Sequence, residues 1–64
     1  MIKIKRVEGK EEVSQQDLKL AEQKIFALQE KGYGALAIMY FLVEHNNFSV
    51  SLTGIDGGYA ATIS

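Results

Sequence analysis

Residues 35–43 read ALAIMYFLV, nine apolar residues in a row without a polar break. A half-exposed strand alternates apolar and polar residues, and an amphipathic helix interrupts an apolar run every second or third position. Because this run does neither, we expect both of its faces to leave water. A 64-residue chain has enough length to cover one face with its own helix but little left for the other. The run therefore predicts that a second subunit or a partner covers the second face.

The run itself has two interpretations. Ile, Tyr, Phe and Val at its centre favour a strand over about residues 35–44. Ala, Leu and Met favour a helix, but a helix that is apolar all round needs neighbours on every side, which we expect so short a chain to lack. We therefore predict a strand and keep the helix as the alternative.

A helix is predicted over residues 14–31, before the run. Ser14 suits its N-cap, and Asp17 three residues later approximates a capping box. Gly32 suits the left-handed position after the helix end. A single stripe at helical spacing is expected to face the core, and it consists of Leu18, Ala21, Ile25 and Leu28.

Alternating residues predict the remaining strands, over residues 2–7, 48–53 and 59–64. Asn46-Asn47 is expected to form a hairpin turn, and Asp56-Gly57-Gly58 a tight turn with a left-handed glycine. The predicted fold class is α+β with the order β-α-β-β-β, as one domain over residues 1–64. One helix packs on a four-stranded, mostly antiparallel sheet, and a crossover lays the first strand parallel to another. The expected sheet side of the core includes Ile2, Ile4, Val50 and Leu52.

The composition favours a protein that assembles with itself. A domain of this size has a marginal core and usually needs disulfides, a metal or oligomerisation. The chain has no cysteine and one histidine, so we expect no metal and no other cofactor. Oligomerisation remains, as a dimer or tetramer. Residues 1–6 lack the pattern of a secretory signal and the run is too short to cross a bilayer, so we expect a cytoplasmic protein without a membrane partner.

Charge is distributed unevenly along the chain, although the net charge is only −1. Residues 1–10 carry four basic residues and one acidic residue, whereas residues 32–64 carry only Glu44 and Asp56 and no Lys or Arg. Solvated surfaces normally carry more charge than that. We therefore expect the second half of the chain to form core and interface.

Two sets of candidate site residues follow. The candidate interface residues are Met39, Phe41, Val43, Ser49, Ser51, Thr53 and Phe26. The candidate ligand-binding residues, for a nucleotide-like molecule held between subunits, are Tyr33, His45, Asn46, Tyr59, Lys5 and Arg6. Nucleic acid is not an expected partner, because the basic excess is small and no recognisable module is present.

Catalysis is not expected. Ser49 or Ser51, His45 and Asp56 supply the residue types of a nucleophile triad, but no strained nucleophile turn surrounds either serine. In its small size, its lack of cysteine and its apolar face, the chain resembles many phage-encoded proteins that antagonise host defences. This resemblance implies a blocking role. The predicted function is a non-enzymatic homo-oligomer that occupies a protein partner. A sponge for a nucleotide-like molecule and an accessory subunit of a larger complex are the alternatives.

Overall fold

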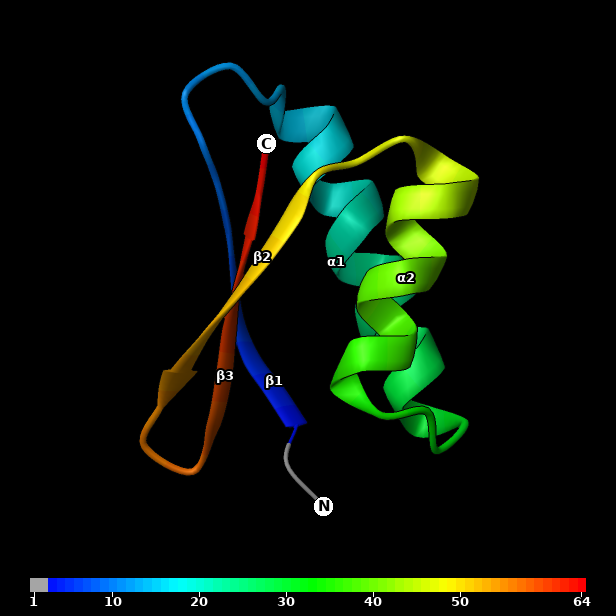
Figure 1. Cartoon of the computed structure of the whole chain (residues 1–64). Coiled ribbons are helices and arrows are strands. Elements are labelled where there is room, and N and C mark those ends of the chain that lie inside the picture. Colours follow the sequence, from blue (N-terminus) through cyan, green and yellow to red (C-terminus); the bar gives the residue numbers. More distant parts are fainter. Residues whose placement is uncertain (1–2) are drawn as a thin grey trace.

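The computed structural model describes residues 3–64 and contains two helices and one mixed sheet (Figure 1). Strand β3 lies in the centre of the sheet, parallel to β1 and antiparallel to β2. Both helices cover one face of the sheet and leave the other face open (Figure 1). The elements are β1 (Lys3–Gly9), α1 (Gln15–Glu30), α2 (Ala35–Asn46), β2 (Val50–Ile55) and β3 (Gly58–Ile63). The α+β class and the parallel first strand are confirmed, but the prediction of one helix on four strands is wrong.

The apolar run forms helix α2 and not a strand. Gly34 is its N-cap, and Asn47, in the left-handed conformation with φ 56°, is its C-cap. The expected hairpin turn at Asn46-Asn47 is therefore wrong, although Asn47 does adopt a positive φ. The argument against a helix required every side of it to be covered. Instead Leu36 stays 65% exposed, so the helical propensity of Ala, Leu and Met prevails.

Helix α1 follows its prediction closely. The Ser14 hydroxyl accepts a hydrogen bond from the Asp17 backbone N–H at 3.1 Å, which caps the first turn. Gly32 has φ +97°, the left-handed conformation that ends the helix without a side-chain clash. The predicted stripe faces the core: Ala21 and Ile25 are fully buried, and its two leucines pack against them.

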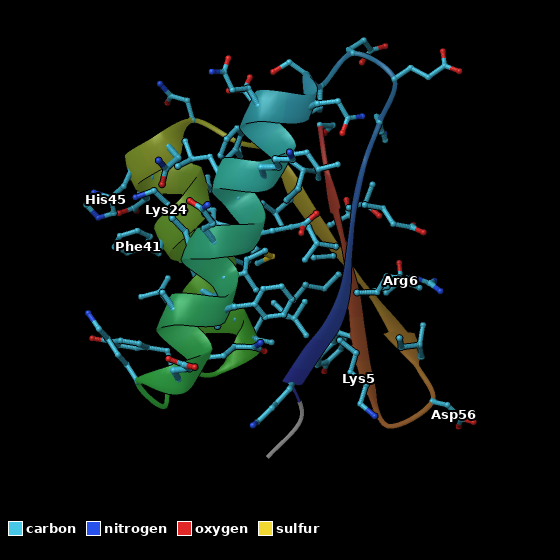
Figure 2. The ribbon with its side chains drawn as sticks, turned by 180° about the vertical axis from the view of Figure 1, so that it is seen from behind. Lys5, Arg6, Lys24, Phe41, His45 and Asp56 are labelled. Carbon is cyan, nitrogen blue, oxygen red and sulfur yellow. The ribbon has the colours of Figure 1, made fainter. Side chains whose placement is uncertain are left out.

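A bulge in β1 explains an irregular spacing in the sequence. The pairing with β3 shifts between Ile4 and Arg6, so Lys5 is an extra residue in β1. The shift lets both Ile4 and Val7 contact the core although they are three positions apart. Lys5 and Arg6 both point away from the helices (Figure 2). The bulge thus places two adjacent cations on the open side of the sheet.

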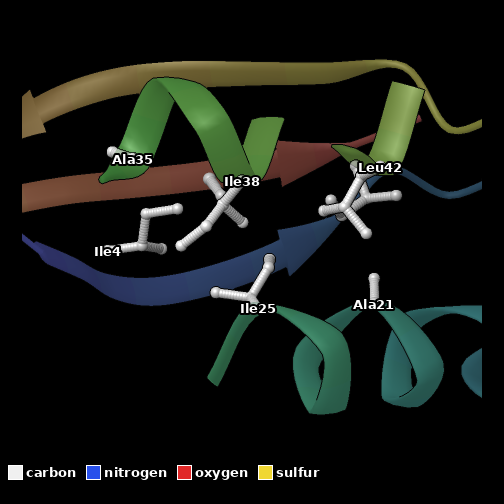
Figure 3. Packing of buried hydrophobic residues seen from close by; sticks show 8 residues of the cluster. Ile4, Ala21, Ile25, Ala35, Ile38 and Leu42 are labelled. Carbon is white, nitrogen blue, oxygen red and sulfur yellow. The ribbon is translucent and has the colours of Figure 1, made fainter. Parts of the chain in front are cut away.

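The core lies between the sheet and the helices and is small (Figure 3). Its largest fully buried side chains are Ile25, Ile38, Leu42 and Ile63. Val50 and Leu52 pack against this cluster as predicted, whereas Ile2 lies outside the described residues. Three of the eight buried residues of this cluster are alanines. Such a core stabilises a lone chain weakly, which favours further burial by association.

Candidate interaction surfaces

The molecule has a charged side and an uncharged side. Strand β1 and helix α1 form the charged side, which faces the viewer in Figure 2. Strand β2 and helix α2 form the uncharged side, which faces the viewer in Figure 1. β2 carries no charged residue, and Glu44 is the only Asp, Glu, Lys or Arg in α2. Each side ends in an edge strand of the sheet, and the two edges differ.

The edge on the charged side is closed at Ile4 by a side chain. The Ile4 backbone N–H donates to Gln29 Oε1 at 2.6 Å, and Gln29 Nε2 donates to the Ile4 carbonyl at 3.2 Å. The Gln29 amide therefore occupies both peptide groups as a neighbouring strand would. Together with the lysines and the bulge, this contact guards β1 against pairing with another chain.

A shallow groove lies beside this closed edge, between β1 and α1. Its lining includes Phe26, which is 45% exposed, together with Lys3, Ile4, Lys5, Gln29 and Glu30. Phe26 therefore belongs to the charged side and not with the other candidate interface residues. Ile4 and Phe26 give the groove an apolar part, and Lys3 and Glu30 give it charges of both signs.

The edge on the uncharged side is open. Ser49 and Ser64 exchange both of their backbone hydrogen bonds, at 3.1 and 2.9 Å. Antiparallel pairs alternate between bonded and non-bonded residues, so the peptide groups of Val50, Leu52 and Gly54 point away from β3. β2 has no proline and an uninterrupted register with β3. None of the usual guards of an edge strand is present in β2.

Helix α2 exposes an apolar stripe next to this open edge. Leu36, Tyr40 and Val43, here called the α2 stripe, are 65%, 63% and 43% exposed. Phe41 marks the flank of α2 that faces α1, because the Lys24 ammonium lies 5.9 Å from its ring centroid. At 100° per residue, Leu36 and Val43 lie on the opposite flank. The α2 stripe and the β2 edge therefore form one continuous uncharged surface.

The sheet face that the helices leave uncovered, here called the open face, carries mostly small and polar residues. The small residues Gly58, Ala60 and Thr62 line its centre. The side chains beside them include Ser51, Thr53 and Ile55 of β2 and Lys5, Arg6 and Glu8 of β1. The Arg6 guanidinium and the Glu8 carboxylate lie 3.4 Å apart and are both exposed, so the pair adds little to stability.

The candidate ligand-binding residues do not converge within one copy. Tyr33 precedes α2, whereas His45 and Asn46 lie in its last turn, roughly 15 Å away. Tyr59 packs against the core, and Lys5 and Arg6 lie on the open face. The His45 ring instead contacts Phe41, with centroids 4.6 Å apart. The amide oxygen of Asn46 is buried without a hydrogen-bond partner in residues 3–64.

The candidate interface residues divide among several surfaces. Val43 belongs to the α2 stripe, Met39 and Phe41 are half-buried, and Ser51 and Thr53 lie on the open face, while Ser49 pairs with Ser64. Sequence reasoning missed Leu36 and Tyr40, whose spacing from Val43 is informative only in a helix. It also missed Gln29, for which the sequence carries no signal.

The components of a nucleophile triad are also dispersed. His45 ends α2 and Asp56 lies in the turn between β2 and β3, so the length of β2 separates them. Within residues 3–64, no helix has the length and apolarity needed to span a membrane. No family model, curated protein or solved structure matches this chain.

Proposed function

We propose that this protein is a non-enzymatic, homo-oligomeric binding protein that acts by occupying a protein partner. The observation that carries the proposal is the exposure of the α2 stripe. Covering a mostly exposed leucine side chain is worth about 1–2 kcal/mol. Leu36, Tyr40 and Val43 therefore offer several kcal/mol to an association that covers them, and isolated exposed residues would not.

Two separate surfaces suit the two parts of this function. The uncharged side suits self-association, because two uncharged surfaces come together without burying an unpaired charge. The open face suits a protein partner, because no helix or strand within residues 3–64 covers it. Its hydroxyl groups and its two cations, Lys5 and Arg6, favour a partner with exposed carboxylates and backbone acceptors. A blocker of this kind is in keeping with the format of phage antagonists of host defence.

The self-association is tested by native mass spectrometry of the purified protein at about ten micromolar. We expect a dimer, or a multiple of it, for the wild type. Leu36→Lys should give a monomer, because a buried ammonium without a partner opposes association. Ala37→Lys is the matched control, since Ala37 is exposed on the Phe41 side of the same helix, and it should leave the mass unchanged. A wild-type monomer would overturn the proposal.

The same spectra test the alternative function. A nucleotide-like molecule that remains bound, visible as added mass and as absorbance near 260 nm, would favour the sponge. We expect no such mass. A stoichiometric protein that co-purifies, and is lost from the Arg6→Glu variant while the oligomer persists, would support occupation of a partner through the open face. Retention of that protein by Arg6→Glu and by Ser51→Arg would exclude the open face.

A further inference from the structure

We infer that two copies of this chain pair through their β2 edges, in antiparallel orientation, to form one six-stranded sheet. The inference rests on the proposed self-association and specifies its contact. Its origin is the contrast between the edges. Gln29 bonds the Ile4 peptide groups of β1, whereas the outward-pointing peptide groups of β2 have no partner within residues 3–64. An open edge strand is a template for another strand, and a twofold axis lets the same strand serve both partners.

The outward-pointing peptide groups define the register of the pair. Val50, Leu52 and Gly54 present an N–H and a C=O each toward the free edge. A twofold axis at Leu52 places Leu52 opposite its own copy and Val50 opposite Gly54 of the second copy. Each of these outward-pointing residues then exchanges both backbone bonds with the residue opposite it, which satisfies the whole edge.

Side chains fit this register on both faces of the sheet. An added Cβ at Gly54 meets no atom within 4 Å, so space is available where Val50 of the second copy would lie. On the open face, Ser51 would lie opposite Thr53 of the second copy, and hydroxyl pairs across strands are favourable. No charged residue of β2 enters the contact.

The helices would meet when the strands pair. Adjacent strands lie about 4.8 Å apart, whereas a helix with its side chains is about 10 Å wide. The two α2 helices lie on the same face of the joined sheet, so their outer flanks come into contact along the α2 stripe. Edge pairing and burial of Leu36 and Val43 are thus two parts of one interface.

A second copy explains this surface better than a foreign peptide. The surface is self-complementary in register and uncharged, and the lone chain has a core in which three of eight buried residues are alanines. A stable dimer buries about 600 Å² or more on each partner. That is about one seventh of the 4437 Å² that the chain exposes, which is within reach of one helix flank and one edge strand.

The decisive variant is Gly54→Pro. The Gly54 N–H points away from β3 and its φ is not positive, so a proline there leaves the β2–β3 pairing intact. It removes a donor from the free edge and adds a ring in the path of a second strand. We expect at least a hundredfold weaker dimerisation with a folded monomer by circular dichroism. Gly54→Ala is the matched control and should remain dimeric.

Amide hydrogen exchange of the wild type provides a second test that needs no variant. In the dimer the Leu52 and Gly54 amides should exchange at least tenfold more slowly than after dilution to the monomer. Fast exchange of both amides in a dimeric protein would overturn edge pairing. So would a Gly54→Pro dimer of wild-type strength alongside a monomeric Leu36→Lys; in both cases the proposed self-association would stand. A monomeric wild type would overturn both inferences.

Discussion

The two edge strands of this sheet show how the same backbone can be closed or left available. In β1 the Ile4 peptide groups bond to the Gln29 side chain, and a bulge interrupts the register with β3. The strand also carries Lys3 and Lys5 on either side of Ile4. In β2 the register is regular and the side chains are uncharged. The two edges therefore differ in backbone bonding, in regularity and in charge, and the proposed docking of a second copy at β2 depends on this difference.

Two glycines give the largest expected contrast in stability: Gly58, in the central strand opposite Lys3 of β1, and Gly54, in the edge strand β2. A Cβ at Gly58 would lie 2.5 Å from the Lys3 carbonyl oxygen, so Gly58→Ala forces the backbones of β1 and β3 apart. We expect a loss of about 1–3 kcal/mol in the free energy of unfolding, as for other overpacked sites. Gly54→Ala should change it by less than about 0.5 kcal/mol. Urea denaturation of both variants measures the difference, and equal effects would contradict this account of the two edges.

Removing the Gln29 amide should make the two edges alike. Gln29→Leu keeps the volume of the side chain but leaves the Ile4 peptide groups to water, at a cost of about 1–2 kcal/mol. With both edges open, sheets are able to add strands at either end, so we expect assemblies larger than the wild-type oligomer. Light scattering measures this change. An unchanged mass would show that the lysines and the bulge guard β1 without Gln29.

The two helices differ at their N-termini: a side chain caps α1, whereas α2 has no side-chain cap. Ser14→Ala removes the hydrogen bond to the Asp17 N–H and should lower the free energy of unfolding by about 1 kcal/mol. Helix α2 has no side-chain cap, because Gly34 is its N-cap, and a Cβ there meets nothing within 4 Å. Gly34→Ser should therefore add a few tenths of a kcal/mol. Thermal unfolding of the two variants should shift the midpoint in opposite directions.

Local signals in the sequence predict the helix of the charged side, α1, but not the helix of the uncharged side, α2. Ser14 and Gly32 bound α1 correctly, because capping depends on residues close together in the chain. The error at α2 came from assuming that a short chain buries its apolar residues. A run without polar breaks has no periodicity to separate helix from strand, and only the tertiary structure shows that Leu36 remains exposed.

The candidate sites were harder to predict than the elements, for a related reason. Once residues 35–44 were assigned as a strand, alternate residues such as Met39 and Phe41 were expected on one face. In the helix Phe41 lies on the flank opposite Leu36 and Val43, and the exposed Leu36 and Tyr40 do not alternate with Val43, so most of the α2 stripe was missed. The Gln29 contact joins residues 25 positions apart, and no local pattern reports such a pair.

Lys5→Glu has the smallest expected effect on stability, and it tests whether the charged side is independent of assembly through the uncharged side. The Lys5 side chain lies over Gly57 and Gly58 on the open face, and its charge has no paired carboxylate within residues 3–64. Lys5→Glu should change the free energy of unfolding by less than about 0.5 kcal/mol and leave the oligomeric mass as it is. This variant alters the charge by two units, whereas Leu36→Lys alters it by one and is expected to dissociate the oligomer. If assembly involves only the uncharged side, the one-unit change at Leu36 should dissociate the oligomer and the two-unit change at Lys5 should not. A changed oligomeric mass in Lys5→Glu would therefore mean that the charged side takes part in assembly.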